Sequence, residues 1–285
     1  PRMLRTSRLP ISSRRLHCAA WVLSVVATLG ACDSDATDPA DPELDVPTTY
    51  AFDSALIDGE SGVSYSGQTV RHVLIHDLVG WIGGLSDAID GATYAPTTAG
   101  DVVAALDYWF RFDSDAYGDE GFALKVDLPC AQSTWNDLSS GKDLVGKLAG
   151  NDPATDHADW STAFTGWADT TIAAHGGTIT SPEGLLRAFF GTLEAQAIDR
   201  ANGTVRLGID GEQLPVHVTE AGQDLQELTA KFLLMAITFS QGTDDYLDDD
   251  VDGKGLLASN EDPADGSAST ELEHGWDEAF GYFGA

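Results

Sequence analysis

The sequence has little positive charge and few cysteines, and each shortage excludes a class of protein. Among 285 residues there are 15 lysines and arginines against 46 aspartates and glutamates, which gives a formal net charge of −31. A protein that binds nucleic acid needs a basic surface to neutralise phosphates, so we expect no nucleic-acid partner. The same charge disfavours electrostatic docking on anionic lipid. Three cysteines are too few for a disulfide scaffold.

Several motifs of familiar enzymes are also missing. The chain has no Gly-x-Ser-x-Gly nucleophile elbow, no phosphate-binding P-loop and no glycine-rich dinucleotide turn. Its apolar runs at residues 19–27 and 232–239 are shorter than the ~20 residues of a membrane-spanning helix. The chain is nevertheless long enough to bury a large core.

Residues 1–31 are predicted to be a signal peptide. All five basic residues of this segment precede the apolar run at 19–27, and no acidic residue occurs there. A basic region, a short apolar region and small residues behind it are typical of secretory signals. Residues 29–32 have the sequence LGAC, which is similar to a bacterial lipobox. This similarity predicts acylation of Cys32, a lipid bilayer as partner, and a place in the bacterial cell envelope.

The remainder is expected to consist of a tether and a helical domain. Residues 32–48 are acidic, rich in proline and poor in large apolar side chains, so they are predicted to be a disordered tether. Residues 49–285 are predicted to form a mainly α domain, a helical bundle. Residues 117–130 alternate weakly and fit one short strand, a hairpin or a loop.

Helical spacing of apolar residues places the individual helices. A central helix is expected from Ser66, as N-cap, through Leu85. The sequence TSPE at 180–183 is typical of a helix start, and the helix it begins is expected to stop at 202–203. The other expected helices lie at 101–112, near 144–148, at 160–174, and from Thr219 or Asp224 onward; residues 232–239 of the last one are expected to be a buried core helix.

The first candidate site lies near the end of the sequence. If residues 271–283 are helical, His274, Asp277 and Glu278 share one face, and Trp276 and Phe283 share the opposite one. An imidazole with carboxylates three and four residues later can surround one cation. The same pattern is also typical of a solvent-exposed helix face.

Two other clusters are candidates for cations. His72 and His76 lie one helical turn apart, as in some transition-metal sites, although the glutamate of the zinc-peptidase motif HExxH is missing between them. Asp248, Asp250 and Asp252 followed by glycine match the first half of a calcium loop. The position of the bidentate glutamate holds serine, so a solvated acidic loop is an equal alternative.

Five segments together resemble a family of bacterial lipoproteins, domain of unknown function 4856. They are residues 50–52, 63–71, 141–150, 180–190 and 274–283, the last being the sequence HGWDEAFGYF. The resemblance extends over residues 49–285. It implies no activity, because none is established for the family. It also implies a longer protein, so we expect the chain to lack a C-terminal part of its bundle.

This family is in turn similar to imelysin-like proteins, which are helical, exported, and linked to iron uptake or described as metallopeptidases. Their motif Gly-x-His-x-x-Glu matches residues 272–277 with leucine for glycine and Asp277 for glutamate, while Glu278 follows one residue later. The resemblance implies metal binding through His274 with Asp277 or Glu278.

Three functions follow as hypotheses. The first is a lipid-anchored envelope protein that binds a transition metal or a metal-bearing ligand. The second is an imelysin-like metal-dependent peptidase. The third is a structural surface lipoprotein with a calcium-stiffened loop at residues 248–252. Protein partners are not predicted.

Overall fold

The computed structural model of the chain describes residues 50–113, 132–152, 179 and 181–283. Contacts divide the chain into two units, Pro1–Tyr50 and Ala51–Ala285, and every element below belongs to the second. The predicted signal peptide, Cys32 and the tether lie outside the described residues, as do the elements expected at 117–130 and 160–174.

The described part of the second unit is helical, which confirms the mainly α fold. Between residues 50 and 283 the described ranges contain isolated β-bridges and no strand. No helix within them is long and apolar enough to span a membrane. The elements are α1 (Ser66–Asp90), α2 (Asp101–Phe110), α4 (Trp135–Leu138), η2 (Val145–Lys147), α6 (Pro182–Ala201), α7 (Leu225–Leu233), η4 (Leu234–Phe239), η5 (Gly242–Tyr246), η6 (Gly255–Leu257) and α8 (Glu271–Tyr282).

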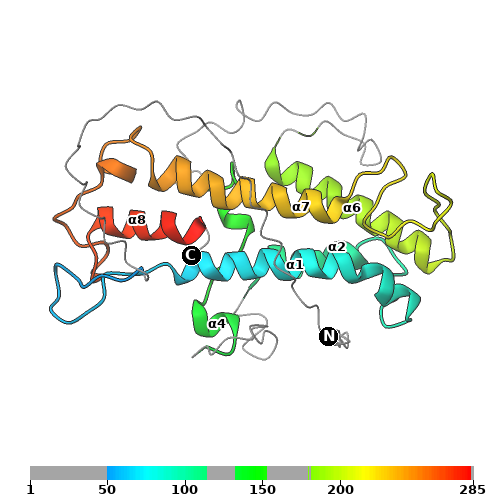
Figure 1. Cartoon of the computed structure of the whole chain (residues 1–285), viewed down its shortest axis with the longest axis horizontal. Helices are drawn as coiled ribbons and strands as arrows, with labels where there is room; N and C mark the ends of the chain where they lie inside the picture. The colour runs from blue at the N-terminus through cyan, green and yellow to red at the C-terminus, as the bar shows by residue number, and fades with distance from the viewer. Residues whose placement is uncertain (1–49, 114–131, 153–178, 180, 284–285) are drawn as a thin grey trace, which may run out of the picture. The chain divides into compact units, whose positions relative to one another are not determined.

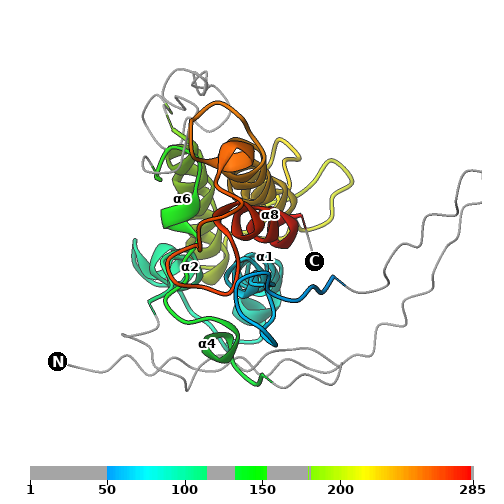
Figure 2. The same ribbon diagram turned by 90° about the vertical axis from the view of Figure 1, so that its left-hand side faces the viewer.

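Helix α1 is the centre of this bundle. It contacts α2, α6, α7 and α8, and α7 runs antiparallel to it (Figure 1). Helix α8 lies beside the N-terminal half of α1, and both views place the two helices next to each other (Figure 2). The side chains of Leu74, Leu78 and Ile82 on α1 are completely buried, as expected for a helix that is covered on several sides.

The predicted helix starts are confirmed at α6 and α7. The Ser181 hydroxyl accepts a hydrogen bond from the Gly184 amide at 3.1 Å, and Pro182 is the first helical residue. The Asp224 carboxylate accepts from two amides at the start of α7. The predicted N-cap of α1 is wrong by one residue, because Ser66 is already helical and Tyr65 precedes it without a side-chain cap.

The expected buried helix at residues 232–239 is corrected by the structure. After Leu233 the chain continues as two π-helical segments, η4 and η5, separated by two residues. Because a π-turn adds a residue to each turn, the apolar stripe of an α-helix is rotated there. Leu234, Met235 and Phe239 are therefore exposed, while Phe232 and Ile237 remain buried.

Candidate functional site

The polar face of α8 is turned inward. Asp277 is completely buried, whereas Trp276 is 53% exposed and Phe283 is 57% exposed. The alternative of a solvent-exposed acidic face is therefore wrong for Asp277. Its carboxylate accepts a 2.7 Å hydrogen bond from the backbone amide of Ser64, just before α1. This charge-assisted hydrogen bond offsets the free-energy cost of burying the carboxylate. It also holds the backbone of the residues that lead into α1.

Glu278 joins three elements through its carboxylate. The side-chain amide of Gln68 on α1 donates to its Oε1 at 2.6 Å. The hydroxyl of Tyr246, at the end of η5, also donates to this carboxylate, and burial together with the Glu278 charge raises the pKa of Tyr246 well above its usual range. The Tyr246 ring stacks on Tyr282 with centroids 6.0 Å apart.

His274 is placed beside Glu278 on the same helix. Its Nε2 lies 3.9 Å from Glu278 Oε2, and its Nδ1 is buried without a hydrogen-bond partner. The structure thus brings together His274 and Glu278 of the predicted metal set. Throughout the described ranges, however, no group of three or more His, Cys, Asp or Glu side chains is placed to hold a metal ion. The metal roles of His274, Asp277 and Glu278 remain predictions.

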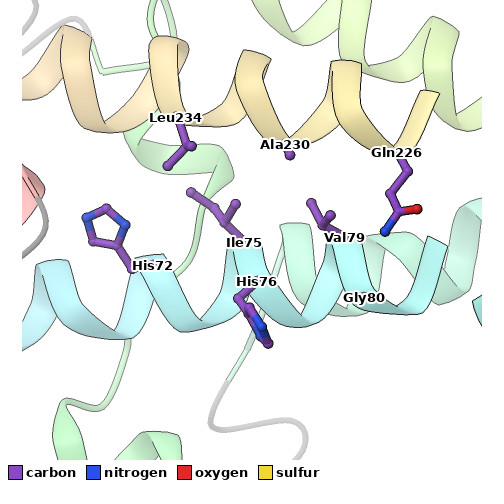
Figure 3. Close-up of a pocket in the computed structure, with 8 residues that line it drawn as sticks. All are labelled: His72, Ile75, His76, Val79, Gly80, Gln226, Ala230 and Leu234. Atoms are coloured by element: carbon purple, nitrogen blue, oxygen red, sulfur yellow. The ribbon is translucent and has the colours of Figure 1, made fainter. Parts of the chain in front are cut away.

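His72 and His76 of α1 line a groove. The groove has a volume of about 410 Å³ and lies between α1 and the helix formed by α7 and η4. Figure 3 shows the His72 ring rising toward Leu234, whereas His76 turns away from α7. The two imidazoles therefore do not converge on one point. The lining residues are His72, Ile75, His76, Val79, Gly80, Gln226, Ala230 and Leu234.

Each of these imidazoles has one ring nitrogen facing an oxygen. His72 Nε2 lies 3.1 Å from the Tyr282 carbonyl, which can only accept, so Nε2 carries a hydrogen, and in the neutral ring the lone pair is on Nδ1. His76 Nδ1 lies 3.2 Å from the Asp77 carboxylate, and in the neutral ring that donates to it the lone pair is on Nε2. Histidines that ligate metals almost always donate their other ring N–H to a carbonyl or carboxylate in this way.

The predicted calcium loop follows η5. Asp250 and Asp252 are exposed, and Asp248 is partly buried with its carbonyl accepting a 2.8 Å hydrogen bond from the Leu256 amide. Gly255, at φ +52°, lies so close to Asp248 that a Cβ there would be 2.5 Å from its carbonyl oxygen. The loop is thus closed by its own backbone. Calcium binding at Asp248, Asp250 and Asp252 remains a prediction.

Residues 155–285 match the family model of domain of unknown function DUF4856. The match supports the resemblance over the part that carries α6, α7, η4, η5 and α8. The matched region contains α7, which forms one wall of the groove, and the His274–Glu278 pair. Helix α1 lies before the matched region. No curated protein and no solved structure matches the chain.

Sequence reasoning missed three polar residues of these sites. Gln68 and Tyr246 hold Glu278, and Gln226 from α7 lines the groove. Gln68 had no sequence signal, since a glutamine in the first turn of a helix is common. Tyr246 is followed by acidic residues that favour a loop, and its role depends on the π-helical path of η5.

Proposed function

We propose that this chain is a lipid-anchored cell-envelope binding protein whose groove between α1 and α7 takes a metal-bearing ligand. The observation behind the proposal is the orientation of the His72 imidazole. The ring points into the groove, and its Nε2 is hydrogen-bonded to the Tyr282 carbonyl. That hydrogen bond orients the ring and leaves Nδ1 to coordinate a metal carried by the ligand.

The remaining lining of the groove suits a small organic ligand. Ile75, Val79 and Leu234 provide apolar surface, and Gln226 provides an amide that can fix orientation. Sites for small molecules are mostly apolar with a few placed polar groups, and their volumes are typically ~300–1,000 Å³. A groove of about 410 Å³ falls within that range.

The charge of the protein supports a cationic or metal-bearing ligand over an anionic one. With a formal net charge of −31, the chain raises the local concentration of cations near its surface. A free metal ion alone has less support, because His72 and His76 point apart and the described ranges place no third ligand beside them.

The peptidase alternative has weaker support. It needs a metal and a free carboxylate near His274, but the Glu278 carboxylate already accepts from Gln68 and Tyr246. The structural alternative rests on the loop at residues 248–252, and it predicts a calcium-dependent stability that is lost in Asp250→Ala.

The proposal is tested by titrating the full chain with copper(II)–iminodiacetate, a metal chelate with open coordination positions. We expect saturable binding that weakens at least about tenfold, or about 1.4 kcal/mol, in His72→Gln. His274→Gln is the matched control and should bind as the unaltered chain does. If His274→Gln lost binding and His72→Gln kept it, the site would lie on α8 and the proposal would be overturned.

A further inference from the structure

The connection between α6 and α7 forms a small hairpin. Leu207 and Gln213 form an antiparallel bridge, flanked by hydrogen bonds from the Gly208 amide to the Glu212 carbonyl and from the Leu214 amide to the Arg206 carbonyl, both 2.8 Å. This loop is drawn in yellow in Figure 1, at the end of the helices opposite α8. None of its residues lines the groove between α1 and α7.

The hairpin is held firmly by one arginine. The guanidinium of Arg206 donates to the backbone carbonyls of Pro215 at 2.8 Å and of Val218 at 2.7 Å, and it also bonds the side chain of Gln196 on α6. An element fixed by several charge-assisted hydrogen bonds loses little conformational freedom when a partner binds.

The outer face of the hairpin is apolar and uncovered. Val205 is 59% exposed, Leu207 is 58% exposed, and Ile209 at the turn is fully exposed. Val205 and Leu207 are two residues apart next to the bridge, a spacing that places the side chains of extended backbone on one face. In this hydrogen-bond pattern the amide and carbonyl of Leu207 point away from the other strand of the hairpin. An exposed edge of this kind is a template for another strand, and residues 205–209 contain no lysine or proline, which often block such pairing.

The charge around the hairpin indicates what the partner carries. Asp199, Asp210, Glu212 and Glu220 are exposed there. The two nearby arginines are engaged internally: Arg206 as described, and Arg200 in a two-point ion pair with Asp90 at 2.6 and 2.8 Å. The surface that faces a partner is therefore acidic. It repels a second copy of this acidic chain and anionic lipid, and it attracts basic residues.

We propose that residues 205–209 are a docking edge for an extended segment of a partner protein in which apolar and basic residues alternate. The segment adds a strand beside Leu207, its apolar side chains cover Val205, Leu207 and Ile209, and its basic side chains face the surrounding carboxylates. Backbone hydrogen bonds supply affinity in this mode of recognition, and the alternate side chains supply specificity.

The test uses the full chain and a fluorescein-labelled octapeptide of alternating valine and lysine. We expect binding by fluorescence anisotropy, with new protection of the Leu207 amide in hydrogen exchange. A peptide of the same sequence with N-methylated backbone and a valine–glutamate peptide should each bind at least about tenfold more weakly. Equal binding of the N-methylated peptide would overturn strand addition, and equal binding of the glutamate peptide would overturn the charge argument.

Variants of the chain complete the test. Leu207→Pro removes the outward amide, whereas Gln213→Pro removes the amide at the bridged position of the other strand and serves as the matched control. We expect the first to weaken valine–lysine binding at least about tenfold and the second to leave it unchanged. Ile209→Ser, which removes the apolar side chain without adding charge, should also weaken binding. The proposal would be overturned if the peptide did not bind and Ile209→Ser abolished either of two other interactions. Loss of self-association would favour a second copy, and loss of sedimentation with phosphatidylcholine vesicles would favour a lipid surface.

Discussion

The side-chain amide of Gln68 donates a 2.6 Å hydrogen bond to the carboxylate of Glu278, and this contact joins the first and last helices of the described bundle. The hydroxyl of Tyr246 donates to the same carboxylate. Replacing Glu278 by leucine leaves both donors without their acceptor in a buried setting. We expect a loss of about 1–3 kcal/mol in the free energy of unfolding, measured by urea denaturation. Glu278→Gln keeps an acceptor oxygen and is the matched comparison, for which we expect a smaller loss. A Glu278→Leu variant as stable as the unaltered protein would contradict this role.

Close packing of α8 against α1 predicts opposite effects for two glycines of α8. A Cβ at Gly281 would lie 2.7 Å from Tyr65 Cβ and 2.9 Å from Gln68 Cβ, whereas at Gly275 the nearest atom is 4.0 Å away. We expect Gly281→Ala to lower stability by about 1–3 kcal/mol through overpacking. Gly275→Ala should raise it by up to about 1 kcal/mol, because alanine favours a helix interior. Thermal unfolding of both variants checks this, and a stabilising Gly281→Ala would show that the helices are further apart.

Glu194 on α6 caps the start of α2 from across the bundle. Its Oε2 accepts from the backbone amides of Gly100 at 2.8 Å and of Val102 and Val103 at 3.1 Å. These amides have no partner within their own helix, and the positive end of the helix dipole favours the charge. We expect Glu194→Ala to cost about 1.5–3 kcal/mol and Glu194→Gln less. Urea unfolding measures both; identical values for the two variants would show that the oxygen does not act as a cap.

Buried tyrosines predict a loss of stability at high pH. Burial, with the charges of Asp101 and Glu194, raises the pKa of Tyr94 to about 12 from 10.0. Burial likewise raises the pKa of Tyr282 above its usual range. These tyrosines ionise near pH 10 in the unfolded chain but stay neutral to higher pH in the folded chain. Their contribution to the free energy of unfolding is therefore complete below pH 10 and is lost as the pH rises toward 12.

The tyrosinate absorbance of the folded protein checks this prediction. Tyr94 should titrate only near pH 12 or on unfolding, and Tyr282 only well above its usual range or on unfolding. Tyr94→Phe should reduce the fall in stability above pH 10. Titration of every tyrosine near pH 10 without unfolding would contradict it.

Local signals in the sequence predicted the helices well and their packing less well. The caps at Ser181 and Asp224 depend only on neighbouring residues, so α6 and α7 start where the pattern indicates. The inward polar face of α8 could not be predicted, because its hydrogen-bond partners at Ser64 and Gln68 are more than 200 residues away in the chain. The exposure of Phe239 was missed because a 3.6-residue period does not hold in η4.

The candidate sites likewise depend on both local spacing and distant contacts. The spacing of His72 and His76 correctly placed both on one helix, and both line the groove. Their divergence and the oxygens that face them depend on Tyr282 and Asp77, and on side-chain orientation that spacing alone does not determine. The second wall of the groove comes from α7, about 150 residues later.

The groove is tested most directly by a nitrogen NMR spectrum of the histidine side chains, assigned with His72→Gln and His274→Gln and recorded with and without zinc(II)–iminodiacetate. We expect His72 in the Nε2–H tautomer, since this nitrogen faces the Tyr282 carbonyl, and we expect the zinc chelate to shift its Nδ1 resonance. A chelate that leaves His72 unchanged and shifts His274 instead would contradict the groove as the binding site.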